Sequence, residues 1–546
     1  MTTTGNNTSK QPKFIFITGG VLSGLGKGVV SASIGKLIDP SNKIVCVKCD
    51  GYLNVDPGTM NPMEHGEVFV LEDGGECDLD FGHYERFLNI DCKRDWSISS
   101  GKIFQNLIEK ERKGDFLGKT VQVIPHATSE IQEWWQTIAK DEDADVVLIE
   151  MGGTVGDYEI QWFLWAAKEL RRTLGRENVM FAHLGLLPVI DGQGQQKTKP
   201  IQQSVTLLQQ FGIFPDVIIG RTKNLLTDES RSKIQVMCNV DENAVASDPD
   251  LEHVYELPLV FAKEGLDKKI SSQLGLSLNQ NLDRWKKLVD SLSSAKEEIT
   301  IAICGKYTDL ADSYISVVEA LKHSGAHLNV KVNVTFVSTV DFEKDTNLRD
   351  ATLGKADGLI VPGGFGNRGT EGKIAAVNYA REHNVPFLGI CYGLQLAVIE
   401  FARNVCGLAD ANSMEIDVKT AHPVVHILEE QKDITKKGGT MRLGSYPAYM
   451  LAGSKISELY ATMRDQGEIS YERHRHRYEV NPKYHSQLIE KGLVFAGTSK
   501  DKTLVEFIEL PNHKYFVATQ AHPELKSRLE DPAPLFYGLV EAALKK

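Results

Sequence analysis

A cysteine between two glycines is the group in this 546-residue sequence whose setting best suits a nucleophile. The stretch FLGICYGLQLAVIEFA, residues 387–402, predicts a strand ending at Ile390, a sharp turn at Cys391 and a helix from about Gly393. Gly389 and Gly393 give the G-x-C-x-G spacing of an elbow that holds the central side chain exposed, and the following helix N-terminus would favour the thiolate. The alternative is a small core residue, because free cysteines are among the most buried side chains.

A thiol nucleophile needs a base, and the base needs a group that orients it. TQAHPEL, residues 519–525, places His522 and Glu524 two positions apart after a C-terminal strand, so both side chains can project to one side of an extended chain. Pro523 favours that extended form at His522. PGGFGNRG, residues 362–369, follows another strand and is expected to supply oxyanion donors from its backbone.

A glycine-rich loop near the N-terminus predicts a phosphate site. FITGGVLSGLGKGVVSASIGKLI, residues 16–38, reads as a strand, a loop and a helix, which would aim backbone N–H groups and Lys27 at phosphate. The loop is not a standard Walker A motif, because five residues rather than four separate Gly20 from Gly26, and Gly28 takes the place of the Ser or Thr. The alternative is a plain turn between strand and helix.

Without a loop hydroxyl, Mg²⁺ must find its oxygen ligands elsewhere. Asp78 and Asp80 are spaced to share one side of an extended segment, and Glu150 ends a buried strand. Each carboxylate alone could be a solvated loop residue. Beside a phosphate loop in the same domain, we favour metal binding.

The composition of the sequence limits the classes of protein to which it can belong. Hydrophobic residues make up 42% and charged residues 25%, and the net charge of −12 argues against a general nucleic-acid or anionic-membrane surface. Eight cysteines, no secretory signal and no apolar run of membrane-spanning length predict a cytosolic protein. We interpret the lone pair Cys46 and Cys49 as structural.

Short apolar runs alternate with helical patterns, which predicts an α/β fold of two doubly wound domains with mainly parallel sheets. We expect a disordered tail over 1–13, a first domain over 14–270, a linker over 271–298 and a second domain over 299–546. The expected strands cover residues 13–18, 43–48, 120–125, 145–150, 179–190, 216–220, 299–304, 356–362, 385–390 and 515–520.

Seven longer strings follow one another along the sequence: TGGVLSGLGKG, NVDPGTMNPMEHGEVFVLEDGGECDLDFGHYERF, RKGDFLGKTVQVIPH, GGTVGDYE, KTKPIQQSV, PGGFGNRG and ERHRHRYEVN. In these strings and in their order, the sequence resembles the CTP synthase family from about residue 13 onward. The resemblance implies an N-terminal amidoligase domain related to dethiobiotin synthetase and a C-terminal class I glutamine amidotransferase domain. It also implies a C–N ligase reaction, UTP + ATP + glutamine + H₂O → CTP + ADP + phosphate + glutamate, through a 4-phosphoryl-UTP and an ammonia channel.

The resemblance also implies roles for residues of the first domain. Lys27 would stabilise the transferring phosphoryl group, and Asp80 and Glu150 would bind Mg²⁺. Lys48 and His65 match positions near the nucleotides. The implied ATP-binding residues are Gly24, Leu25, Gly26, Lys27, Gly28, Val29 and Asp80. The implied UTP- and CTP-binding residues are Ser23, Asp157, Tyr158, Glu159, Lys197, Thr198, Lys199, Pro200, Ile201, Gln202 and Lys233.

In the second domain, Cys391, His522 and Glu524 match the catalytic triad of the family. The implied oxyanion and glutamine-binding residues are Gly364, Tyr392, Gly393, Leu394, Gln395, Glu415 and Arg475. The amides of Gly364 and Tyr392 are our candidate oxyanion donors.

The family further implies CTP as inhibitor, GTP as activator, and a homotetramer that can form filaments, without nucleic-acid or membrane partners. The sequence departs from the usual family strings at five positions, namely Gly51, Tyr158, Tyr392, Ala521 and Leu525. None of these substitutions removes a catalytic group.

Two other hypotheses remain open at this point. The first is a related amidotransferase that aminates another acceptor, such as a carboxylate, and KTKPIQQSV together with GGTVGDYE argues against it. The second is a non-catalytic protein that keeps the fold for assembly or regulation. The retention of every catalytic residue argues against that reading.

Overall fold

The computed structural model describes residues 11–60, 66–190, 194–279, 281–305, 311–343, 346–364, 366–427 and 441–545. Their contacts divide the chain into two compact units. The first comprises Met1–Asp56 and His83–Lys286, and the second comprises Pro57–Gly82 and Lys287–Lys546. Most of the expected tail, residues 1–10, lies outside the described residues.

The first unit is built on a seven-stranded sheet in the order β5-β2-β6-β1-β7-β8-β9. All its neighbouring strands pair in parallel. Its strands are β1 (Lys13–Gly20), β2 (Ile44–Asp50), β5 (Ser97–Ser99), β6 (Val146–Met151), β7 (Val179–Leu186), β8 (Val217–Thr222) and β9 (Val245–Pro249). The central strands are apolar along most of their length and buried, as expected for a parallel sheet covered on both faces.

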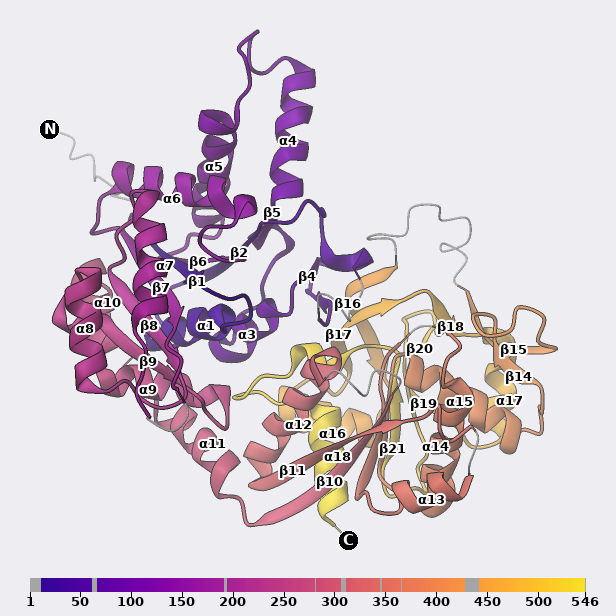
Figure 1. Cartoon of the computed structure of the whole chain (residues 1–546). Helices are drawn as coiled ribbons and strands as arrows, with labels where there is room; N and C mark the ends of the chain where they lie inside the picture. Colours follow the sequence, from indigo (N-terminus) through magenta and orange to yellow (C-terminus); the bar gives the residue numbers. More distant parts are fainter. Residues whose placement is uncertain are drawn as a thin grey trace, which may run out of the picture. The chain divides into compact units, whose positions relative to one another are not determined.

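Helices alternate with these strands, and Figure 1 shows α4 and α5 extending together from the rest of the first unit. The helices are α1 (Lys27–Leu37), α4 (Ser100–Lys113), α5 (Thr128–Asp141), α6 (Gln161–Leu174), α7 (Lys199–Gln210), α8 (Asp228–Cys238), α9 (Leu257–Glu264) and α10 (Leu266–Leu274). Two further helices, α3 (Asp80–Leu88) and α11 (Asp283–Ser294), cross the division between the units.

The second unit has a nine-stranded sheet in the order β11-β10-β12-β13-β21-β20-β19-β16-β17. The strands from β11 to β21 pair in parallel, and those from β21 to β17 pair antiparallel. Its strands are β10 (Glu297–Gly305), β11 (Val330–Ser338), β12 (Gly358–Val361), β13 (Phe387–Ile390), β16 (Arg442–Met450), β17 (Ile469–His476), β19 (Val494–Thr498), β20 (Val505–Glu509) and β21 (Phe516–Thr519).

Hydrophobic cores lie on both faces of this sheet. In β12, Leu359 and Val361 belong to one core and Ile360 to the other, because successive side chains of a strand point to opposite faces. The helices are α12 (Ile315–Leu328), α13 (Thr346–Leu353), α14 (Thr370–His383), α15 (Tyr392–Asn404), α16 (Lys455–Arg464), α17 (His485–Glu490) and α18 (Pro534–Leu544). Smaller sheets are formed by β14 (Ala411–Ser413), β15 (His422–Ile427) and β18 (Tyr478–Val480), and by β3 (Phe69–Val70) with β4 (Glu76–Cys77).

The architecture is the predicted α/β class, with two local corrections. The strand expected at 120–125 is absent: residues 123–127 form a single helical turn before α5, and Val123 and Ile124 are each 43% exposed. The short apolar run therefore leads into helix α5 and does not form a buried strand. The strands β16, β17, β19 and β20 of the antiparallel half are not among the expected strands, because strands such as β16 and β17 mix polar residues with apolar ones and do not form the short apolar runs typical of parallel strands.

The segment Pro57–Gly82 packs by its contacts into the second unit, although it lies among first-unit residues in the sequence. The turn of its hairpin β3–β4 contacts both β16 and β17: in β16, the Ser445 N–H donates to the Glu72 carbonyl at 2.9 Å, and in β17, Arg473 Nε lies 3.0 Å from Glu72 Oε1. The division between the units otherwise falls inside α11, between Lys286 and Lys287.

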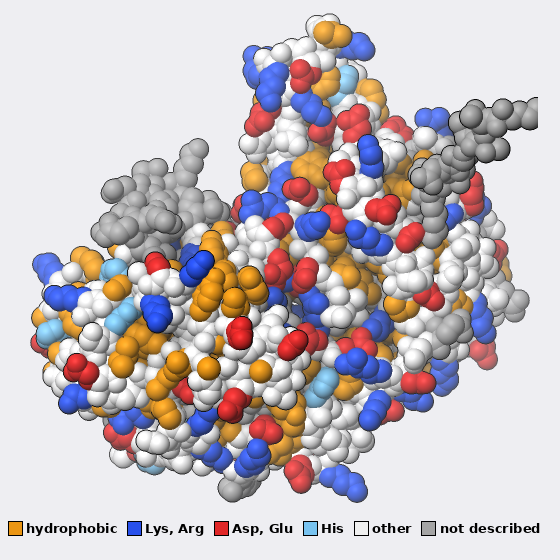
Figure 2. Space-filling model, turned by 180° about the vertical axis from the view of Figure 1, so that it is seen from behind, with side chains coloured by type: hydrophobic (Ala, Val, Ile, Leu, Met, Phe, Trp, Pro, Cys, Tyr) orange, Lys and Arg blue, Asp and Glu red, His pale blue; other side chains and the backbone are white. Residues whose placement is uncertain are grey.

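Surface charge is mixed. On the face seen in Figure 2, acidic and basic side chains are interspersed rather than gathered into one basic surface. None of the helices in the described ranges has the length and apolar character that crossing a membrane requires.

Candidate functional site

Cys391 lies at a strained turn between β13 and α15. Its φ of 52° and ψ of −98° fall in a region that side chains other than glycine rarely adopt. The conformation is held from both sides: the Cys391 N–H donates to the Thr519 carbonyl at 2.6 Å, and α15 begins at the next residue. A Cβ at Gly393 would lie 2.1 Å from the Val361 carbonyl oxygen, so only glycine lets the helix start this close to β12.

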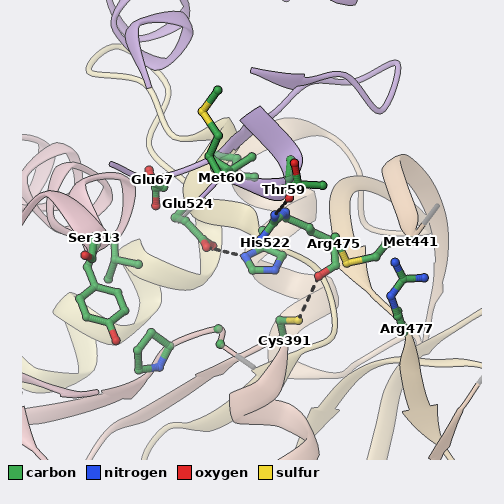
Figure 3. Close-up of a pocket in the computed structure, with 18 residues that line it drawn as sticks. Thr59, Met60, Glu67, Ser313, Cys391, Met441, Arg475, Arg477, His522 and Glu524 are labelled. Carbon is green, nitrogen blue, oxygen red and sulfur yellow. Dashed lines mark hydrogen bonds and ion pairs between the residues drawn. The ribbon is translucent and has the colours of Figure 1, made fainter. Parts of the chain in front are cut away.

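His522 and Glu524 follow β21 and face the same cavity as the cysteine (Figure 3). His522 Nδ1 lies 2.7 Å from Glu524 Oε1. Burial by itself would lower the pKa of His522, but the Glu524 carboxylate and the Cys391 sulfur outweigh it and raise that pKa from 6.5 to about 10. The imidazole is therefore an imidazolium at neutral pH, able to donate a proton.

Cys391 lines two cavities of the second unit. The larger, of about 560 Å³, is also lined by Gly364, Arg475, His522 and Glu524. The smaller, of about 140 Å³, is lined by Gly364, Cys391, Tyr392, Gln395, Glu415, His476, Arg477 and Tyr478. The nucleophile thus has a small polar pocket on one side and a wider space on the other.

The smaller cavity has the polarity to bind a ligand that carries both an ammonium and a carboxylate group. It holds one carboxylate, Glu415, one guanidinium, Arg477, and the buried Gln395 Oε1, which has no hydrogen-bond partner within the described residues. Arg475, the arginine selected from sequence, does not line this cavity, and its Nε lies 2.9 Å from Glu76 Oε1. The sequence reasoning missed Arg477, which occupies an equivalent alternate position in RHRHR.

The residues of both candidate oxyanion donors line the small cavity together with Cys391. The Tyr392 N–H is in the first turn of α15, where N–H groups have no intrahelical acceptor, and Gly364 lines both cavities. The glycine loop is fixed to the pocket, because the Gly366 N–H donates to Glu415 Oε1 at 2.9 Å. The Leu394 side chain packs into the core instead, so only its backbone can serve the site.

In the first unit, the glycine-rich loop joins β1 to the N-terminus of α1. Gly24 and Gly26 have φ values of 73° and 95° and no heavy atom near their missing Cβ, which keeps the concave backbone open. Lys27 is the first residue of α1, and its Nζ donates to the Gly153 carbonyl at 2.9 Å. Around it, Leu25 and Gly28 are buried, Val29 is half-buried and Ser23 is exposed.

Glu150 is a buried carboxylate at the penultimate position of β6. Its Oε1 lies 2.8 Å from Lys48 Nζ, and its Oε2 accepts from the Tyr84 hydroxyl. Carboxylate oxygens of this kind suit Mg²⁺, which takes few protein ligands and completes its shell with phosphate and water. Within the described ranges no cluster of three or more His, Cys, Asp or Glu side chains could hold a metal alone. Asp80, the first residue of α3, belongs by its contacts to the second unit.

The residues predicted to bind the pyrimidine nucleotide lie on two loops and helices of the first unit. Asp157, Tyr158 and Glu159 are exposed, and Asp157 Oδ2 accepts from the Thr154 N–H at 2.9 Å. Thr198 and Ile201 are buried, Lys199 and Lys233 are exposed, and Lys197, Pro200 and Gln202 are half-buried. His65 lies outside the described residues.

Comparison with known proteins agrees over nearly the whole chain. Residues 13–276 match the family model "CTP synthase N-terminus", and residues 309–542 match "Glutamine amidotransferase class-I". The CTP synthase of Methanocaldococcus jannaschii is 51% identical over 97% of this chain and 98% of its own length.

Two further relatives are equally close. The CTP synthase of Methanococcus maripaludis is 49% identical over 98% of this chain and 100% of its own length. The CTP synthase of Thermococcus kodakarensis is 52% identical over 98% of this chain and 99% of its own length. With an amidoligase region, a glutamine amidotransferase region and relatives of this similarity along its length, the chain belongs to the CTP synthase family.

Proposed function

We propose that this protein converts UTP to CTP, using ATP to activate the uracil and ammonia released from glutamine as the nitrogen source. The observation that carries the proposal is the elbow cysteine, Cys391, which lines one cavity together with His522 and Glu524. The phosphate loop with Lys27 in the first unit supports the second half of the reaction.

Glutamine hydrolysis follows from the groups around the sulfur. The Cys391 thiolate attacks the side-chain amide carbon, and the amides of Gly364 and Tyr392 stabilise the oxyanion that develops. The His522 imidazolium, with Glu524 orienting its ring, gives its proton to the departing ammonia. Water then cleaves the thioester, with the neutral His522 as base, releasing glutamate and restoring the thiolate.

Amination requires that O4 of UTP become a good leaving group. Transfer of the ATP γ-phosphoryl group to O4 forms ADP and 4-phosphoryl-UTP, and ammonia then displaces phosphate at C4. The N–H groups at the start of α1 would bind ATP phosphates, and Lys27 would stabilise the charge on the transferring group. Asp80 and Glu150 would hold Mg²⁺, which neutralises phosphate charge when bound.

The pyrimidine-nucleotide site belongs to the first unit. We assign UTP and CTP to the loop of Asp157–Glu159, to Lys197–Gln202 and to Lys233, on the family match of those positions. Inhibition by CTP, activation by GTP, a homotetramer and an ammonia channel are part of the same proposal.

The testing experiment compares wild type with Cys391→Ala, each supplied with UTP, MgATP and either glutamine or ammonium chloride. Cys391→Ala should lose glutamine-dependent CTP formation and keep the ammonia-dependent reaction, because the first unit needs only ammonia. Lys27→Ala should lose both. A wild type that hydrolyses glutamine but makes no CTP from either nitrogen source would exclude UTP as the acceptor.

A further inference from the structure

Gln520 lies directly behind the nucleophile. This residue follows β21, is fully buried, and its Nε2 lies 3.6 Å from Cys391 Sγ. Sulfur is a weak acceptor as a thiol and a much better one as a thiolate. Cys391 Sγ also lies 3.9 Å from the Arg475 carbonyl oxygen, to which a thiol S–H can donate.

A chain of amides fixes which end of Gln520 faces the sulfur. The nitrogen and oxygen of a side-chain amide differ only in donating or accepting hydrogen bonds, so the partners decide the orientation. Gln395 Nε2 lies 3.0 Å from the Tyr478 carbonyl, which can only accept, so the Gln395 nitrogen must face it. The same nitrogen also donates to Gln520 Oε1 at 3.3 Å.

The orientation of the Gln395 amide determines the orientation of the Gln520 amide. Because Gln520 Oε1 is occupied as the acceptor for Gln395, the Gln520 nitrogen is turned toward Cys391. A backbone carbonyl of Tyr478 therefore sets the polarity of the group that meets the sulfur, through two buried side chains. Burial strengthens the effect, since a reversed amide would leave oxygen against oxygen at Tyr478 and oxygen against the sulfur.

We propose that Gln520 is a positioning residue of the glutaminase site, which donates a hydrogen bond to the Cys391 thiolate and whose orientation is dictated through Gln395 by the Tyr478 carbonyl. The inference rests on the proposed glutaminase function of Cys391. It adds a donor from a residue that lines neither of the two cavities, so that the thiolate is stabilised while Cys391 stays open to both of them.

The proposal is tested by replacing the donor and measuring the sulfur directly. Gln520→Met removes the N–H at nearly constant length, and Gln520→Glu replaces it with a carboxylate oxygen that repels the thiolate. Iodoacetamide alkylation of Cys391, followed on its peptide by mass spectrometry over a range of pH, reports the thiolate without substrate. Gln466→Met, which removes another amide of the second unit, is the matched control.

We expect Gln520→Met to slow alkylation at neutral pH about tenfold, the scale of one hydrogen bond to a charged group, and to recover the wild-type rate at alkaline pH. Gln520→Glu should be slower still, and Gln466→Met unchanged. The kcat for glutamine hydrolysis should fall in parallel, with KM for glutamine changing less than about twofold, because the bond is not made to the substrate. A merely structural role would not shift the pH dependence of alkylation.

Wild-type alkylation and hydrolysis by Gln520→Met at every pH would overturn the proposal. If Gln520→Met does not fold, as judged by thermal unfolding, Gln395→Met decides instead: it leaves Gln520 in place but removes the group that orients it. Slowed alkylation in Gln395→Met supports the relay, and an unchanged rate overturns it. Failure of wild type to form CTP from ammonia would overturn the UTP assignment alone, because alkylation of Cys391 requires no nucleotide.

Discussion

The charge state of one histidine decides the chemistry at the nucleophile. His522 is buried, yet the carboxylate of Glu524 and the sulfur of Cys391 hold its pKa at about 10. The folded pKa lies above the unfolded value of 6.5, so this interaction stabilises the fold fully below pH 6.5 and is lost as pH rises through about 10. In the proposed glutaminase reaction, this is the proton that the departing ammonia receives.

Replacing Glu524 should therefore move both activity and stability. In Glu524→Gln the pKa of His522 should fall, so that glutamine hydrolysis declines at a lower pH than in wild type. We expect kcat to drop about 100-fold, within the range of general acid–base contributions. The measurements are the pH–rate profile and the pH dependence of the free energy of unfolding. If the alkaline limb of the pH–rate profile lies at the same pH in the variant and in wild type, Glu524 does not set the charge of His522.

Two neighbouring arginines, Arg475 and Arg477, offer a matched pair of variants for testing the proposed glutamine pocket. Arg477 lines the small cavity with Glu415, whereas Arg475 is paired with Glu76. Arg477→Ala should raise KM for glutamine about 10- to 100-fold, as expected for loss of a charged hydrogen bond, and Arg475→Ala should raise it much less. Ammonia-dependent synthesis is the control for both. The reverse order of effects would return the carboxylate-binding role to Arg475.

At the scale of elements, the phosphate loop and α7 touch through a glycine. A Cβ at Gly20 would lie 1.4 Å from Ser204 Oγ, and Ser204 Oγ in turn lies 2.7 Å from His183 Nε2. His183 Nδ1 lies 2.9 Å from the Thr18 hydroxyl, and burial, with a smaller effect of Lys27, lowers the pKa of His183 to about 3. The neutral imidazole of His183 therefore links β1, through Thr18, to α7, through Ser204.

Gly20→Ala should push α7 away from the loop. We expect a free-energy loss of about 1–3 kcal/mol, typical of overpacking, together with a raised KM for UTP. Ser204→Gly makes room for the new methyl group, so the double variant should be more stable than the sum of the two single changes predicts. Denaturant unfolding of all four proteins measures this coupling. If the change in the free energy of unfolding of the double variant equals the sum of the two single changes, the contact between Gly20 and Ser204 does not constrain the loop.

At the scale of the whole molecule, a segment early in the sequence completes the second unit. Arg473 is fully buried and its Nε lies 3.0 Å from Glu72 Oε1. Burial by itself would raise the pKa of Glu72, but Arg473 and Lys526 outweigh it and lower that pKa from 4.5 to about 2. The depressed pKa gives stability that is present above pH 4.5 and lost as pH falls through about 2.

Glu72→Gln should leave the buried Arg473 without its carboxylate. We expect the second unit to lose about 3–5 kcal/mol at neutral pH, the usual cost of breaking a buried ion pair. In wild type, the free energy of unfolding should fall as the pH drops from 4.5 to about 2. The variant should lack this contribution, because it has no carboxylate to protonate at this position. Lys331, which pairs with Glu298 at the surface, offers a control, because Lys331→Gln should cost less than about 1 kcal/mol. Equal effects of the two changes would contradict the structural role of the Glu72 segment.

The sequence by itself determined the features that depend on short stretches of backbone. The elbow at Cys391, the phosphate loop before Lys27 and most parallel strands follow from glycine spacing and apolar runs, because local geometry restricts what such stretches can form. An apolar run alone was not enough at 120–125, where no neighbouring strand buries it.

Only the tertiary structure decided which groups meet across long separations in the chain. It placed Arg477 rather than Arg475 in the small cavity, packed Pro57–Gly82 into the second unit, and turned the Gln520 nitrogen toward the nucleophile. Each of these outcomes depends on which buried polar group finds a partner in a packed interior. Spacing along the sequence does not encode that choice, because the partners come from strands and helices that only folding brings together.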